Sequence, residues 1–259
     1  MVIFEWLYQL NLVVLYPLTI ILIAGGAELG NWIGRRFRRT EPAGATIGTL
    51  TGAALGLLAL LLAFSFSIAL SLYDVRRNLI LEEANAISST ANFALMLPEP
   101  AQEPILSLLR DYAAVRITLD VSYVPSKMER EIARSLDLQS RLWQQAIAVT
   151  ATAPQSLPAY RFVASLNEMN NIHEKLVTAL RCHVPGAVMF ILIGVAMVAM
   201  GLTGYNAGVA GARQRLPNLI MSFTVAVLIL MVVDLDRPNR GLIQVPVQAL
   251  VDATQGIRP

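Results

Sequence analysis

Four stretches of this chain are uncharged and strongly apolar over lengths that suit a membrane-spanning helix. They cover residues 6–27, 42–73, 184–205 and 216–233. About 20 apolar helical residues cross the hydrocarbon core of a bilayer, and a helix satisfies its own backbone hydrogen bonds there. The pattern therefore predicts an integral membrane protein with four transmembrane helices.

Most polar residues lie between the second and third apolar stretches. Apolar residues in 101–181 recur at helical spacing, as in Ile105, Leu108 and Tyr112. Prolines divide this region into roughly three expected helices. Residues 74–96 contain neither glycine nor proline, so the second transmembrane helix is expected to continue well beyond the membrane.

These elements predict an all-α fold, a polytopic membrane protein in which four transmembrane helices carry a central extramembrane helical bundle. We expect five segments in chain order. They are the first transmembrane helix with a basic loop (1–40), the second transmembrane helix extending out of the membrane (41–97), the extramembrane bundle (98–183), transmembrane helices three and four (184–236) and a C-terminal tail (237–259).

Composition agrees with a membrane protein and narrows its partners. Hydrophobic residues make up 55% of the chain and charged residues only 15%, against about a quarter in soluble domains. The net charge of +2 gives nucleic acid no electrostatic support. Cys182 is the lone cysteine, so no internal disulfide is expected. His173 and His183 have no metal-ligand spacing around them, and we expect neither a metal nor a cofactor.

Basic residues near the spans predict the orientation. The loop between the first two spans carries four arginines at 35–39, and the loop between the last two carries Arg213 and Arg215. Short loops rich in arginine face the cytoplasm. We therefore expect a bacterial inner membrane protein whose central bundle is extracytoplasmic.

Small residues form a stripe along one face of the second span. Their spacing is close to the helical period, so they share one side of the helix, which continues as polar positions beyond the membrane. Small residues allow close helix packing, but the same smallness would leave room for water and ions in a pore. Two aromatic residues beside the stripe either form a hydrophobic constriction or simply pack and face lipid. The pore-lining candidates are Gly52, Gly56, Ala63, Phe64, Phe66, Ser67 and Ser71.

Charged residues gather at the ends of spans two and four, toward the bundle. Groups of both signs at one depth suggest mutual pairing, because a lone charge near hydrocarbon is costly. A charged vestibule that attracts ions, or cation binding between the carboxylates, would use the same residues. The candidates are Asp74, Arg76, Arg77, Glu82, Glu83, Asn85, Asp234, Asp236, Arg237 and Arg240.

Several of these segments resemble the bacterial bestrophin-like domain family of four-span membrane proteins. The resemblance is carried by 64–67 (FSFS), 73–77 (YDVRR), 83–87 (EANAI) and 234–238 (DLDRP), and it extends over nearly the whole chain. The resemblance does not directly imply an activity. The family's name points by analogy to bestrophins, which are oligomeric anion channels.

The functional expectation follows from the membrane helices, the small stripe and this resemblance. We expect a homo-oligomeric ion channel or channel-like protein that favours anions and has the lipid bilayer and small inorganic ions as partners. A non-conducting scaffold or sensor whose bundle binds a partner is the alternative. No nucleophile, base or phosphate-binding motif indicates an enzyme.

Overall fold

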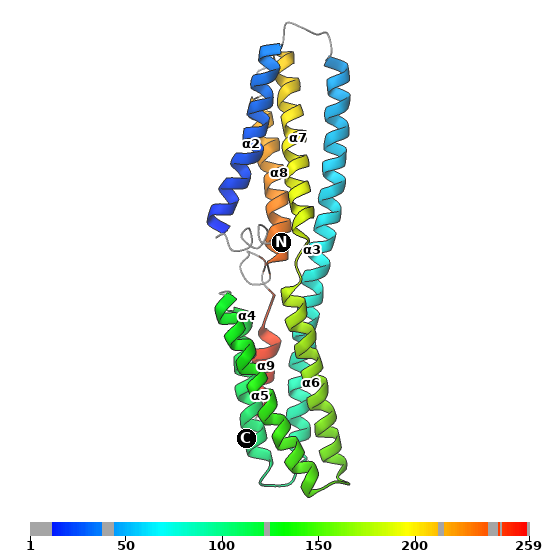
Figure 1. Ribbon diagram of the computed structural model, residues 1–259, viewed down its shortest axis with the longest axis vertical. Helices are drawn as coiled ribbons and strands as arrows, with labels where there is room; N and C mark the ends of the chain where they lie inside the picture. The colour runs from blue at the N-terminus through cyan, green and yellow to red at the C-terminus, as the bar shows by residue number, and fades with distance from the viewer. Residues whose placement is uncertain are drawn as a thin grey trace. The chain divides into compact units, whose positions relative to one another are not determined.

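The computed structural model describes residues 12–37, 44–121, 125–211, 215–237, 243 and 245–257. All regular structure in these residues is helical (Figure 1), which confirms the predicted all-α class. The helices are α2 (Leu12–Phe37), α3 (Gly44–Ala94), α4 (Gln102–Val121), α5 (Pro125–Thr152), α6 (Leu157–Arg181), α7 (Gly186–Ala210), α8 (Arg215–Asp236) and α9 (Gln248–Gly256).

Four of the helical stretches are long and apolar enough to cross a bilayer. They are Val14–Phe37, Ile47–Ala94, Arg215–Asp236 and Leu157–Ala210, the last of which comprises α6 and α7 and has its apolar part in α7. The four predicted spans are confirmed. At about 1.5 Å per residue, the 51 residues of α3 are more than twice as long as a bilayer core is thick. As predicted, this helix continues past its apolar half into the polar part of the chain.

Described residues fall into two compact units. The membrane unit contains those of Met1–Ser71 and His183–Arg237, together with Ile243, and the bundle unit contains those of Leu72–Cys182 and residues 245–257. The chain leaves helical structure at Cys182 and re-enters it at Gly186, so α6 and α7 are separate helices.

In the membrane unit, α2 packs against α7 and α8 (Figure 1). Glycines make the contact with α7 unusually close. A Cβ atom on Gly26 would lie 3.3 Å from the carbonyl oxygen of Met197, and one on Gly30 would overlap the carbonyl oxygen of Gly201. On the α7 side, a Cβ on Gly204 would overlap the carbonyl oxygen of Ala27. Such close backbone approach is how small residues hold membrane helices together.

The bundle unit has one continuous apolar core. It is built from the extramembrane half of α3 with α4, α5, α6 and α9, and it includes Ile87, Leu109, Leu142 and Leu166. The C-terminal segment, which we expected to be a tail, forms α9. Leu250 of α9 is fully buried in this core, because the helix lies against α4.

Candidate functional site

The small face of α3 is open in this chain. Of the seven predicted pore-lining positions, six are exposed and Phe66 is half-buried. A Cβ atom added to Gly52 or Gly56 would have no atom within 4 Å. The opposite side of α3 is buried along a narrow line, at Thr51, Leu58 and Ser65. The small face is therefore not used to pack α3 against the described helices of its own chain.

The exposed face continues into the bundle unit as polar positions. Asp74, Asn78, Glu82 and Asn85 are all exposed on α3, and helical spacing keeps them on the side that carries the small residues. Arg77 is also exposed, whereas Arg76 and Glu83 are fully buried. The charged candidates on α3 thus divide into a solvated set and a buried set.

Buried Arg76 ties α3 to the end of α6. Its Nε donates a hydrogen bond to the carbonyl oxygen of Ala179 at 3.1 Å, and its guanidinium also donates to the carbonyl oxygen of Cys182. The last carbonyls of a helix have no partner within the helix. Arg76 supplies one, and it places a positive charge at the negative end of the α6 dipole.

The end of α8 holds backbone groups of the membrane unit through two buried carboxylates. Asp236 accepts a hydrogen bond from the backbone N–H of Val184 at 2.9 Å, just before α7 begins, and its Oδ2 lies 3.6 Å from Nδ1 of His183. Asp234 accepts one from the N–H of Ile243 at 3.0 Å and a longer one from the Tyr16 hydroxyl at 3.5 Å. Arg237 beside them is also buried, and Arg240 lies outside the described residues.

Replacing Asp236 with alanine should lower the free energy of unfolding by about 2 kcal/mol, because the N–H of Val184 loses its acceptor. The predicted pairing of Asp234 and Asp236 with Arg76 and Arg77 stays a prediction. If it holds, removing an arginine as well should restore part of the loss. Chemical unfolding of the purified single and double variants in detergent measures both effects. Strictly additive losses would contradict the pairing.

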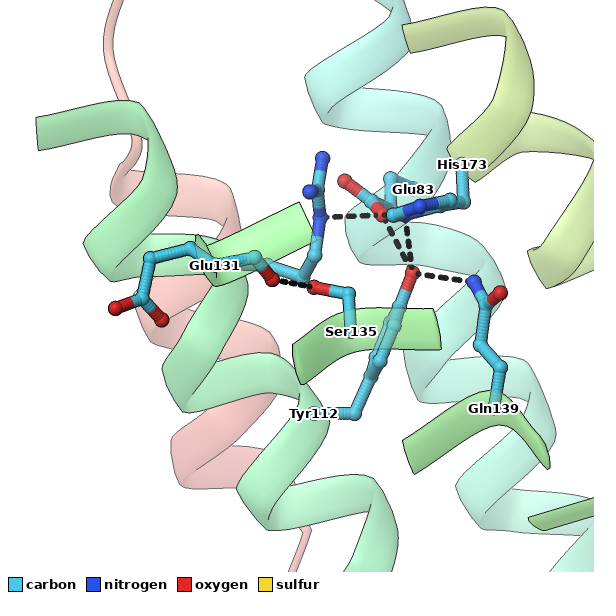
Figure 2. Close-up of polar contacts among 7 residues, drawn as sticks. Glu83, Tyr112, Glu131, Ser135, Gln139 and His173 are labelled. Carbon is cyan, nitrogen blue, oxygen red and sulfur yellow. Dashed lines mark hydrogen bonds and ion pairs between the residues drawn. The ribbon is translucent and has the colours of Figure 1, made fainter. Parts of the chain in front are cut away.

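Four helices of the bundle unit meet at a buried polar cluster (Figure 2). Glu83 of α3, Tyr112 of α4, Gln139 of α5 and His173 of α6 point toward one another. Arg116 of α4 completes the cluster, with its Nε 2.8 Å from Oε1 of Glu83. Both side chains of this ion pair are fully inaccessible to solvent. We define these five residues as the polar cluster.

The donors and acceptors around the Tyr112 hydroxyl determine which atom carries the proton in each hydrogen bond. Its hydroxyl lies 2.8 Å from Oε1 of Glu83, 3.1 Å from Nδ1 of His173 and 3.3 Å from Nε2 of Gln139. A carboxylate can only accept, so the single hydroxyl proton goes to Glu83. Gln139 and His173 must then both donate to the tyrosine oxygen. His173 therefore carries a proton on Nδ1.

The charges agree with this assignment. Burial first, and then the carboxylate of Glu83, raise the pKa of Tyr112 well above its ordinary value, so the hydroxyl keeps its proton.

Glu83 belongs to the extramembrane part of α3, because it lies ten residues past the apolar stretch 42–73. Burial alone would raise its pKa, but Arg116, His173 and Tyr112 together hold that pKa below the ordinary 4.5. The stability that this carboxylate contributes is therefore present above about pH 4.5 and is lost as the pH falls through the folded-state pKa.

Sequence reasoning found only one member of the polar cluster as a candidate. The sequence pattern places Glu83 in the charged vestibule or pairing set and Tyr112 on an apolar helix face, and it gives His173 no zinc-ligand spacing. Arg116 and Gln139 were missed. Their spacing in the sequence contains a signal. Tyr112 and Arg116 are four residues apart, as are Ser135 and Gln139, so each pair of polar residues lies on one side of its helix. Ser135 is fully buried beside the cluster and donates to the carbonyl oxygen of Glu131 at 2.9 Å (Figure 2).

Comparison with solved structures shows the fold. The chain is similar to a bacterial bestrophin homologue from Klebsiella pneumoniae, with a TM-score of 0.70 and 15% identity over 95% of this chain and 97% of that one. A single-substitution variant of a bestrophin homologue from the same organism also gives a TM-score of 0.70, with 13% identity over 96% of this chain and 97% of that one. No curated protein matches the chain.

The family follows from the sequence match. The model of the bestrophin-like domain matches residues 21–250, which include most of the membrane unit, the whole polar cluster and the start of α9. This confirms the resemblance that was carried by the FSFS, YDVRR and DLDRP segments. The chain belongs to the bestrophin-like domain family.

Proposed function

We propose that this protein is an ion channel formed by several copies of the chain, with α3 of each copy lining the path. The observation that carries the proposal is the exposed small face of α3, from Gly52 to Ser71, which no described helix of the same chain covers. One chain has too few spans to enclose a pore, so the path would lie between copies. Small and hydroxyl side chains would leave room for water there.

The flank of this face carries the best candidate for a constriction. Phe64 is 61% exposed, which is costly in water but natural against lipid, a second copy or a narrow apolar pore. Phe66 is half-buried and less available. We propose Phe64 as the residue that narrows the path.

Two considerations point to opposite ion preferences. The analogy with bestrophins favours anions. Asp74 and Glu82 on the exposed face outnumber Arg77 by one charge, and this excess by itself would attract cations to the path. The reversal potential of the reconstituted protein under a salt gradient decides between the two.

Cysteines on the open face test the channel. With Cys182 replaced by serine, cysteines at Ala63, Ser67 and Ser71 are expected to react with a charged thiol reagent from water, and the reaction should block most of the current. Cysteines at Leu58 and Ala69 serve as controls, because these positions are buried within the chain. Bilayer recordings and thiol labelling measure the two effects. Absence of current in demonstrably oligomeric protein, with all three face positions shielded, would reject the channel.

Location and orientation belong to the same proposal. The arginines at 35 and 36 end α2 and Arg215 begins α8, which supports a cytoplasmic face there and an extracytoplasmic bundle. We place the protein in the bacterial inner membrane. A cysteine at the exposed Ser140, in a Cys182→Ser background, should react with an impermeant maleimide on intact cells. Labelling only after permeabilisation would place the bundle in the cytoplasm.

One observation favours the second candidate, a non-conducting scaffold or sensor. Leu136, Trp143 and Ile147 on α5 are 45%, 38% and 58% exposed, and their spacing places them on one side of the helix. Exposed apolar residues gathered on a soluble bundle mark interaction surfaces. The current recordings separate this function from conduction.

A further inference from the structure

A groove runs between α3 and α6 in the bundle unit. It has a volume of about 720 Å³, which lies in the range of small-molecule sites in proteins. Its apolar lining comes from Leu72, Val75 and Leu79 of α3 and from Ala179 of α6. We define this feature as the α3–α6 groove. An apolar lining of this kind gains free energy when an apolar group covers it.

The two helices run antiparallel along the groove, so its two ends differ. At one end, the guanidinium of Arg76 donates hydrogen bonds to the carbonyl oxygens of Ala179 and Cys182. At the other end, Nδ1 of His173 on α6 lies 3.7 Å from Oε1 of Glu83 on α3. The apolar residues of the lining begin at the first end, where α3 leaves the apolar half of its sequence. The acidic residues of the lining lie at the second end.

This second end carries an excess of negative charge. Glu82 of α3 and Glu174 of α6 line the groove there, together with one cation, Lys175. All three side chains are exposed. Within the described part of the chain, neither carboxylate belongs to an ion pair. Two carboxylates against one lysine leave one negative charge for a ligand to neutralise.

We propose that the α3–α6 groove binds an amphiphilic amine, with its apolar body on the leucine and valine side chains of α3 and its ammonium group between Glu82 and Glu174. A primary alkylamine is protonated at neutral pH, as lysine is. Its three N–H donors suit a pair of carboxylates, and its apolar body covers the lining. Ligand and groove are thus complementary in charge as well as in polarity. The site does not depend on whether the protein conducts ions.

The distance along α3 argues against a phospholipid of the bilayer as the occupant. Glu82 lies nine residues past Tyr73, the last residue of the apolar stretch, and nine helical residues extend about 13 Å. The headgroup layer on each side of a bilayer is only about 5–8 Å thick. A headgroup phosphate would also face the excess of carboxylates. An amine with one apolar group reaches this level without leaving a second chain in water.

A ligand in the groove leaves the small face of α3 open. Each residue of an α-helix is turned by about 100° from the one before it. Val75 and Leu79 therefore lie about 100° and 140° around the helix from Asp74, which continues the small face. Glu82 lies about 80° from Asp74, at the border between the two sides. The ligand would border the proposed path without filling it.

The thiol of Cys182 reports whether the groove is occupied, because this lone cysteine lines the groove and is exposed. The experiment measures the rate at which the purified full-length protein in detergent reacts with neutral dipyridyl disulfide. Octylamine should slow this reaction at least severalfold and in a saturable way. Octanol has the same chain without the charge and should protect only at a much higher concentration. Octanoate carries the opposite charge and should protect least.

Removal of the carboxylates tests the ammonium position. Glu82→Gln and Glu174→Gln should each raise the octylamine concentration that gives half protection about threefold, and the double variant should raise it about tenfold. Glu168→Gln is the matched control, because Glu168 is exposed on α6 but does not line the groove. This control should leave the concentration unchanged. Titration calorimetry of the same variants in a Cys182→Ser background measures the affinity without the thiol and should rank them in the same order.

Three outcomes would overturn the proposal. Equal protection by octylamine, octanol and octanoate would indicate an apolar groove that does not select an amine. The same half-protecting concentration in the wild type and in the Glu82→Gln, Glu174→Gln double variant would remove the carboxylates from the site. A Cys182 thiol that stays unreactive in the folded protein until a co-purified phospholipid is extracted would assign the groove to a lipid.

Discussion

Alanine at Gly30 is expected to destabilise the membrane unit by more than about 3 kcal/mol, whereas alanine at Gly25 of the same helix should stabilise it. The added Cβ at Gly30 would overlap the backbone carbonyl of Gly201 and approach its Cα to 3.0 Å. A backbone cannot rotate away as a side chain can, so α2 and α7 must move apart. At Gly25 the new Cβ has no atom within 4 Å, and only the helix propensity of alanine remains, about 1 kcal/mol in its favour.

Unfolding of the purified variants in detergent, followed by circular dichroism, measures this difference. The comparison is internally controlled, because the two substitutions are chemically identical and five residues apart. Gly204→Ala on α7 should reproduce the loss, since its Cβ would overlap the carbonyl of Ala27. Equal stability of the Gly25 and Gly30 variants would mean that α2 and α7 do not touch along their glycines.

The membrane helices could be predicted because their signal is local. A span needs only a long uncharged apolar run, and each of the four runs contains its own signal. The long extension of α3 was also predictable, because no glycine or proline interrupts residues 74–94. Helix α9 was not predicted. Its nine residues are stabilised by burial of Leu250 in the bundle core, and a short helix that depends on tertiary packing has little local signal.

The close contact between α2 and α7 could not be read from either helix alone. The stripe of small residues on α3, from Gly52 to Ser71, is the longest such pattern in the sequence, yet within the described part of this chain its members are exposed. On α2, Gly26, Gly30 and Gly34 recur every four residues, and Gly204 and Gly208 do the same on α7. This spacing is typical of a close helix contact, but it does not say which helix is the partner. Their importance depends on which helix faces which, and that pairing is a property of the folded chain rather than of any local spacing.

The polar cluster shows the same limit for a site. Glu83, Tyr112, Gln139 and His173 come from four helices separated by up to 90 positions in the sequence. Each taken alone has an ordinary explanation, as a surface acid, an aromatic core residue, a surface amide or an isolated histidine. What distinguishes them is that all are buried at one level of the bundle, and periodicity predicts which face is buried but not which faces meet.

Loss of the Glu83 carboxylate is the second change for which we expect a large effect. Glu83→Ala should lower the stability of the bundle unit by about 3–5 kcal/mol, because Arg116 would keep its charge in a fully buried position without its carboxylate partner. Glu82→Ala is the matched control. Its side chain is the sequence neighbour but is exposed, so its removal should change stability by less than about 0.5 kcal/mol.

A double variant separates the ion pair from mere packing. Glu83→Leu with Arg116→Met removes both charges, and this should restore most of the stability that Glu83→Leu alone loses, since replacing a whole buried pair by apolar residues is often close to neutral.

In this double variant Tyr112 can turn its hydroxyl proton toward Nδ1 of His173, which lies 3.1 Å away. The histidine would have to move its own proton to Nε2. Nitrogen NMR of His173 should therefore show Nδ1–H in the wild type and Nε2–H in the double variant. An Nε2–H tautomer in the wild type would refute the proton assignment, and a double variant less stable than Glu83→Leu would refute the ion pair.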